Sequence, residues 1–162
     1  MIARMTETEI FQYLLAETKK SKDPRGAAAA CIARSGELLL SATSSDDGKY
    51  HAEHRLIEAI QADELILEAT DILYTTVEPC SSRADETHPS DDVSLLIELG
   101  IREIVFALRS PSYAGTLSLA RLQDAGIAMR QLDNPTLVQE IAEQFNTSLD
   151  PTEPGTDHKP LS

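Results

Sequence analysis

Apolar and polar residues follow a helical period near the start of the chain and a strand period soon after it. Residues 6–20 repeat apolar side chains at helical spacing. Thr6 followed three residues later by Glu9 is a capping-box pattern, which predicts that a first helix begins there. Two short apolar runs, 27–33 and 37–43, are joined by a turn that contains glycine and predict a hairpin.

The rest of the chain alternates between predicted helices and predicted strands. Residues 51–62 carry one apolar face and predict a helix, and the β-branched run 72–77 predicts a buried strand. The later elements are a short helix that ends at Gly100, a strand over 104–108, a helix over 117–125, a short segment over 127–132 and a last helix from Pro135. This alternation predicts an α/β protein with a mainly parallel sheet and helices on both faces.

The length of the chain fits one domain. It has 162 residues, within the usual range of ~100–200 residues per domain. Residues 148–162 contain three prolines and little apolar material, so we expect a disordered tail there and a single folded domain over residues 1–147.

The net charge of the chain limits the classes of partner that it can bind. Lys and Arg number 14 and Asp and Glu number 27, which gives a net charge of −13. An acidic surface is unsuited to nucleic acid or to an anionic membrane, because both are bound by basic residues. No apolar run approaches the ~18–20 residues that span a bilayer. With only two cysteines, a disulfide scaffold is not expected, and we expect a cytoplasmic protein.

Side chains that can bind a metal or transfer a proton lie at the start of one predicted helix and after the end of the next predicted strand. His51 and Glu53 open one predicted helix, and Cys80 follows the next predicted strand. Imidazole and thiolate are good ligands for zinc. Because α/β sheets bind ligands beyond the carboxyl ends of their parallel strands, these residues predict a site at that edge.

The same residues resemble a known family. His51-Ala52-Glu53 followed by Pro79-Cys80 resembles the H-x-E and P-C motifs of the zinc-dependent nucleobase and nucleotide deaminases. The stretches YTTVEPCSSR, LLIELGIREIVFAL and AGTLSLARLQDAGI are similar to the deaminase domain of riboflavin biosynthesis, and the resemblance covers roughly residues 6 to 132. It implies the three-layer α/β/α cytidine deaminase-like fold, with a mixed, mainly parallel five-stranded sheet.

The resemblance also implies a mechanism. His51, Cys80 and a third residue would hold Zn²⁺, which would lower the pKa of a bound water toward about 7. The resulting hydroxide would add to the ring carbon that carries the amino group. Glu53 would take the water's proton, deliver it to the ring nitrogen, and later protonate the departing ammonia. A helix-face glutamate in contact with solvent is the alternative reading of Glu53.

The third ligand departs from the family pattern, because no C-x-x-C follows Cys80. Counting back from Gly100 places the expected ligand at Asp92, with Asp91 and His88 as alternatives. A carboxylate would keep two anionic ligands on the ion, which favours Asp92. Acidic residues here are also ordinary in the first turn of a helix, so that reading stays open.

The substrate implied by the resemblance is a small aminated pyrimidine or purine at the nucleotide level. Arg83 lies where the riboflavin-type enzymes carry basic residues near the substrate phosphate, although a solvent-exposed loop arginine is also common. Tyr50 would stack near the ring or simply pack. Residues 23–26 lack the family's asparagine, which leaves the ring itself open.

Two functions are compatible with this sequence. One is a zinc aminohydrolase, and the other is a non-catalytic, deaminase-like binding or partner subunit with an incomplete metal site. The presence of Glu53 favours catalysis. Members of this superfamily often form oligomers, so a homodimer or homotetramer is expected.

Overall fold

The computed structural model describes residues 4–24, 26–48, 50–79, 92–109 and 113–148, without the side chains of residues 92 and 113–118. Five helices and five strands are assigned in these ranges. The helices are α1 (Glu7–Thr18), α2 (Ala52–Ala62), α3 (Asp92–Leu99), α4 (Tyr113–Asp124) and α5 (Pro135–Ser148). The strands are β1 (Ala29–Arg34), β2 (Glu37–Thr43), β3 (Asp71–Val77), β4 (Glu103–Leu108) and β5 (Ala128–Gln131).

The strands form one mixed sheet in the order β2-β1-β3-β4-β5. β1 pairs antiparallel with both β2 and β3, whereas β3, β4 and β5 pair in parallel. The five-stranded mixed sheet confirms the expected fold class. Its parallel part is limited to three strands, because the hairpin that supplies β1 and β2 joins β3 in the antiparallel sense.

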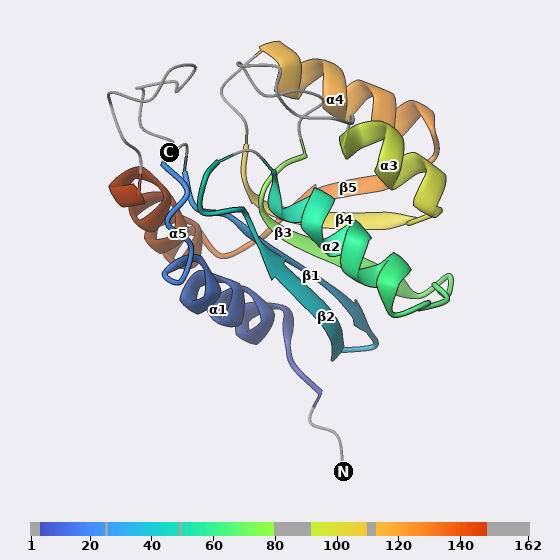
Figure 1. Cartoon of the computed structure of the whole chain (residues 1–162), viewed down its shortest axis with the longest axis horizontal. Helices are drawn as coiled ribbons and strands as arrows, with labels where there is room; N and C mark the ends of the chain where they lie inside the picture. The colour runs from blue at the N-terminus through green and yellow to red at the C-terminus, as the bar shows by residue number, and fades with distance from the viewer. Residues whose placement is uncertain (1–3, 25, 49, 80–91, 110–112, 149–162) are drawn as a thin grey trace.

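Helices cover both faces of the sheet (Figure 1). α1 and α5 pack against one face, and α2, α3 and α4 lie over the other. The interior is mostly aliphatic, with Phe11 and Phe106 as the largest fully buried side chains. The structure therefore has the three α/β/α layers that the resemblance implies.

The alanine-rich first strand is explained by its position in the sheet. β1 lies between β2 and β3 and is buried along five of its six residues. Side chains of one strand alternate between the two faces, so Cys31 packs under α1 and α5 and Ile32 packs under α2. Low strand propensity is outweighed here by burial on both sides.

Helix ends follow local sequence signals closely. In α1, the Thr6 side chain accepts a hydrogen bond from the Glu9 backbone N–H at 3.2 Å, and the Glu9 carboxylate accepts one from the Thr6 N–H at 3.0 Å. This confirms the predicted capping box. α4 begins at Tyr113, before the expected start at Leu117, because Gly115, a weak helix former, conceals the first turn.

The C-terminal boundary stays a prediction. α5 extends to Ser148, whose hydroxyl accepts a hydrogen bond from the Ala27 N–H at 2.7 Å. Residues 149–162, most of the predicted tail, lie outside the described residues. Across the residues that are described, no helix is both long and apolar enough to span a bilayer.

Candidate functional site

The start of α2 and the end of β3 meet at the carboxyl edge of the parallel strands. His51 is the N-cap residue of α2, with φ −69° and ψ 159°, and Glu53 lies in the first helical turn. Thr75, two residues before the end of β3, donates a hydrogen bond to Glu53 Oε1. This contact joins the start of α2 to the end of β3.

Apolar packing fixes the position of α2. Leu56, Ile57 and Ile60 are buried against the sheet, in one core cluster with Ile32 and Leu73. These helix positions recur at the spacing of one helical face. That face is held on β1 and β2, and the polar first turn of α2 reaches the carboxyl end of β3 through Glu53 and Thr75.

Glu53 is a buried acid rather than a residue of a solvated helix face. It is 4% exposed and shares its surroundings with Thr75, which is fully buried. Burial of a carboxylate without hydrogen-bond donors is costly. The Thr75 hydroxyl supplies one such donor, so the site holds an acidic side chain in a defined place.

Tyr50 and His54 form an aromatic pair beside the helix start. Their ring centroids are 5.0 Å apart with the planes tilted by 30°. His54 Nε2 lies 2.9 Å from Glu58 Oε1, one helical turn further on. Tyr50 therefore packs on His54, which agrees with the packing alternative for this residue, and it remains half-buried next to His51.

A second buried acid follows β3. Glu78 is 6% exposed, and its backbone N–H donates to Leu108 O at 2.8 Å, which continues the pairing of β3 with β4. Its Oε2 lies 4.0 Å from Arg109 Nη1, and the Arg109 guanidinium stands 5.2 Å from the Phe106 ring centroid. Glu78 thus extends the pairing of β3 with β4 by one residue.

The segment before β1 reaches the same edge. Asp23 is fully buried, and the Ser21 hydroxyl donates to Ser44 O at 2.9 Å. The Ala28 N–H donates to Ser44 Oγ at 3.0 Å. Because the amino end of β1 lies beside the carboxyl end of β3, this segment borders the candidate site.

Several predicted site residues fall outside the described part of the chain. Cys80, Arg83, His88 and Asp91 belong to this group, and Asp92 is described only as the first residue of α3. Within the described residues, no group of three or more His, Cys, Asp or Glu side chains is arranged to hold a metal ion. The ligand set therefore stays a prediction.

Cys31 does not belong to the site. Its side chain is fully buried on the face covered by α1 and α5, whereas Glu53 reaches the sheet from the opposite face. Burial raises the pKa of the Cys31 thiol to about 12. Such a thiol is a poor metal ligand, because metals bind the thiolate.

The donor chemistry at the described edge fits zinc. An imidazole at a helix start, followed by a buried carboxylate, supplies one nitrogen ligand and one proton acceptor of the kind that zinc hydrolases use. Cys80, which lies outside the described residues, would add a sulfur donor. His51, Cys80 and a third donor are therefore a suitable set for this ion.

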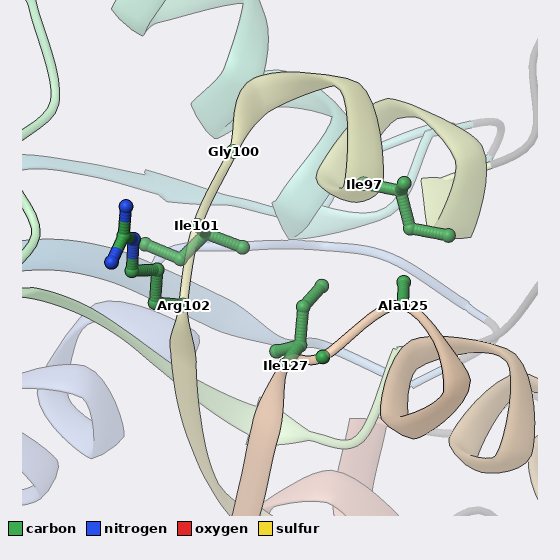
Figure 2. A pocket seen from close by; sticks show the side chains of 7 residues that line it. Ile97, Gly100, Ile101, Arg102, Ala125 and Ile127 are labelled. Atoms are coloured by element: carbon green, nitrogen blue, oxygen red, sulfur yellow. The ribbon is translucent and has the colours of Figure 1, made fainter.

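A surface hollow lies at the other edge of the sheet (Figure 2). It is lined by Ile97, Gly100, Ile101, Arg102, Ala125, Gly126 and Ile127. These residues precede β4 and β5, at the amino ends of the parallel strands. Since ligand sites of α/β sheets lie at the carboxyl ends, this hollow is separate from the candidate site.

Comparison with known proteins supports the fold. No protein-family model matches the sequence, and no curated protein matches it. The structure is similar to the diaminohydroxyphosphoribosylaminopyrimidine deaminase/5-amino-6-(5-phosphoribosylamino)uracil reductase of Thermotoga maritima, with a TM-score of 0.67 and 20% identity. That match covers 83% of this chain but 37% of the Thermotoga chain, so this chain spans little more than a third of that protein.

Two shorter proteins match over most of their own length. The Rib2 deaminase of Aspergillus oryzae, solved in complex with DARIPP, gives a TM-score of 0.68 at 19% identity and covers 88% of this chain and 91% of that chain. The dCMP deaminase of cyanophage S-TIM5, solved with dCMP and dUMP, gives a TM-score of 0.61 at 14% identity, over 78% and 96%.

These similarities define the class of fold. The chain adopts the cytidine deaminase-like α/β fold. Within it, the solved structures that it resembles include deaminases of the riboflavin type as well as a dCMP deaminase. This confirms the fold expected from the sequence motifs.

The local sequence does not single out Thr75 as a member of the candidate site. The run 72–77 predicts a buried strand, in which threonine is ordinary as a β-branched residue. The available signal was the alternation of faces: Thr75 shares the face of Leu73, which packs under α2. A hydroxyl at that position needs a hydrogen-bond partner, and Glu53 is on the helix above it.

Proposed function

We propose that the protein is a zinc-dependent hydrolytic deaminase that acts on a small aminated pyrimidine or purine at the nucleotide level. The observation that carries this proposal is the buried Glu53 carboxylate, two residues after His51, at the carboxyl edge of β3. The deaminase fold of the chain adds support.

The metal would be held by His51, Cys80 and Asp92, with Asp91 and His88 as alternatives to Asp92. When bound, zinc supplies the Lewis acidity that lowers the pKa of a water molecule toward neutrality. Asp92 is the favoured third ligand because its carboxylate keeps the same ligand charge as a second thiolate. Asp92 would present this carboxylate from the first residue of α3.

Glu53 would carry the protons of the reaction. It takes a proton from the attacking water and delivers it to the ring nitrogen as the C–O bond forms. A second proton passes to the amino group, the C–N bond breaks, and ammonia leaves with the ring carbonyl formed. A buried carboxylate held by a hydrogen bond from Thr75 suits this role, because its oxygens have a fixed position beside the strand end.

The substrate class rests on the similar structures and on charge. The Aspergillus enzyme was solved with DARIPP and the cyanophage enzyme with dCMP and dUMP. A net charge of −13 disfavours tRNA or single-stranded DNA as the substrate. Arg83 would pair with the phosphate of a small nucleotide, and Tyr50 would lie beside its ring. The cytoplasmic location and a homo-oligomeric state stay predictions.

Ammonia release tests the proposal. The wild-type protein, loaded with zinc, is incubated with cytosine, adenine and guanine compounds as bases, nucleosides and nucleotides, and with the phosphoribosylated diaminopyrimidine. We expect ammonia from at least one nucleotide and its loss in Glu53→Gln, since the amide cannot accept the proton. Glu98→Gln, which neutralises an exposed acid on α3, is the matched control and should keep full activity. Absence of both zinc binding and ammonia release would favour a non-catalytic partner subunit.

A further inference from the structure

A buried hydroxyl stands directly beneath the proposed proton carrier. Thr75 is fully buried in the central strand β3, on the sheet face that α2 covers. Its Oγ1 donates to Glu53 Oε1 and also lies 3.0 Å from Val77 O. Thr75 therefore links the carboxylate of the helix to the backbone of the strand end.

Packing alone gives no reason for a hydroxyl at this position. Leu73, on the same face of β3, is fully buried and apolar, as are Ile32 and Ile104 on the neighbouring strands. Valine has nearly the same shape as threonine and would avoid burying a polar group. The hydroxyl is explained by the hydrogen bond that it gives to Glu53.

We propose that Thr75 is the positioning residue for the Glu53 carboxylate. This inference rests on the proposed function, because it assigns a role to Thr75 through the residue that would move the protons. A β-branched side chain has few χ1 rotamers, and Thr75 lies in a strand paired on both sides. Its hydroxyl is thus a rigid support for the longer and more flexible Glu53 side chain.

The two acceptors near Thr75 define how this support works. A hydroxyl donates one hydrogen and accepts through two lone pairs. Thr75 Oγ1 lies within hydrogen-bond reach of both Glu53 Oε1 and Val77 O. The hydroxyl is thus held between the carboxylate of the helix and the backbone of the strand end.

Thr76 is a natural control for this role. It is the next residue of the same strand and is 1% exposed, and its side chain points to the opposite face. Its hydroxyl accepts a hydrogen bond from the Ala29 N–H at 3.1 Å, on the side of β1 and away from Glu53. Replacing Thr76 removes a buried hydroxyl at equal depth without touching Glu53.

The test compares Thr75→Val, Thr75→Ser and Thr76→Val on the best substrate of the ammonia-release panel. A positioning role predicts that Thr75→Val lowers kcat by about tenfold to a hundredfold, since misplacing a catalytic group by ~1 Å has an effect of that size. KM and the zinc content of the purified protein should stay near the wild-type values. Thr75→Ser should restore most of kcat, because it returns the hydroxyl.

A second measurement does not depend on turnover. A crystal structure of Thr75→Val should show the Glu53 carboxylate rotated away from its wild-type position, with the α2 backbone in place. Thr76→Val is expected to unfold at lower denaturant concentration than wild type, through the lost Ala29 contact, while keeping its kcat.

The outcomes separate this inference from the proposed function. An active wild type whose Thr75→Val variant keeps full kcat, or loses no more than Thr76→Val, would overturn the role of Thr75 alone. An unmoved Glu53 carboxylate in the variant structure would also overturn it. A wild type that binds zinc but releases no ammonia from any compound would overturn the proposed function, and the positioning role with it.

Discussion

Arg34 and Asp71 face each other across β1 and β3 and are joined by two hydrogen bonds. Arg34 Nε donates to Asp71 Oδ1 at 2.8 Å, and Nη2 donates to Oδ2 at 3.0 Å. The Glu68 backbone N–H also donates to Oδ2, at 2.8 Å. This ion pair lies at the amino end of β3, opposite the candidate site. Substitutions here therefore test the stability of the fold without affecting the proposed catalytic residues.

The Arg34–Asp71 pair predicts an acid-dependent loss of stability. Burial opposes ionisation of Asp71, but the hydrogen bonds from Arg34 and the Glu68 N–H, together with the Arg34 charge, lower the pKa of Asp71 below its ordinary 3.8. A lowered folded-state pKa stabilises the protein above the unfolded-state pKa, and this contribution disappears as pH falls through the folded-state value. We expect Asp71→Asn to lower the free energy of unfolding at pH 7 by about 1–3 kcal/mol.

Urea unfolding at several pH values checks this prediction. The difference between wild type and Asp71→Asn should shrink as pH drops below about 4, where the wild-type carboxylate begins to protonate. Asp63→Asn, at an exposed acid, is the control and should change stability little. A difference that stays constant from pH 7 to pH 3 would show that the ion pair is not its source.

The rate at which a thiol reagent labels the native protein should report zinc binding by Cys80. The pKa of the Cys31 thiol is raised to about 12 by burial, so Cys31 should react with a thiol reagent only when the protein unfolds. Native-state reactivity would then report on Cys80 alone. We expect slow labelling of the zinc-loaded protein and faster labelling of one thiol per chain after chelation.

Variants assign the labelled thiol. Cys80→Ser should abolish the chelator-dependent reaction, whereas Cys31→Ala should leave it intact. Equal labelling rates with and without chelator would contradict zinc ligation by Cys80.

Replacing Gly26 by alanine should lower the stability of the protein, because a Cβ at this position clashes with the Phe145 ring. Gly26 has φ +112°, and a Cβ there would lie 2.1 Å from Phe145 Cζ on α5. Gly100 also has a positive φ, +84°, but a Cβ there meets nothing within 4 Å. We expect Gly100→Ala to cost about 1–2 kcal/mol from the backbone alone and Gly26→Ala to cost more.

Urea unfolding measures both costs. Truncating the ring with Phe145→Ala should cancel part of the Gly26→Ala effect in the double variant, because the clash is removed and the backbone strain remains. Additive effects of the two substitutions would mean that Phe145 does not constrain Gly26.

The third zinc ligand is tested by single substitutions. Asp92→Ala should lower zinc retention during dialysis by about tenfold or more, as expected when one of three protein ligands is lost. His88→Ala and Asp91→Ala should retain the metal. Zinc loss in His88→Ala with retention in Asp92→Ala would contradict the register counted from Gly100.

The parts of the fold that follow short-range rules were predictable. The Thr6–Glu9 capping box, the turn before β2 and the glycine after α3 are encoded within a few residues, and each was predicted at its place. The extent of the parallel sheet was harder to predict, because antiparallel docking of β1 on β3 depends on contacts between segments far apart in the chain.

For the candidate site, the sequence indicates which residues open the helix but not their surroundings. His51 and Glu53 are singled out by their place at a predicted helix start and by the H-x-E motif, and both lie at the start of α2. The sequence does not predict the contact of Thr75 with Glu53, because this contact depends on how α2 packs over the sheet and not on neighbouring residues in the chain. The same is true of the Tyr50–His54 pair, which forms through the folded turn that leads into the helix.

The proposed function requires a zinc ion between the His51 imidazole and the Cys80 thiolate, beside Glu53. Anomalous diffraction at the zinc edge, from crystals of protein purified without chelator, locates such an ion. We expect one anomalous peak per chain within about 2.0–2.3 Å of His51 nitrogen and Cys80 sulfur. No peak at this position, even after the crystals are soaked in zinc, would contradict it.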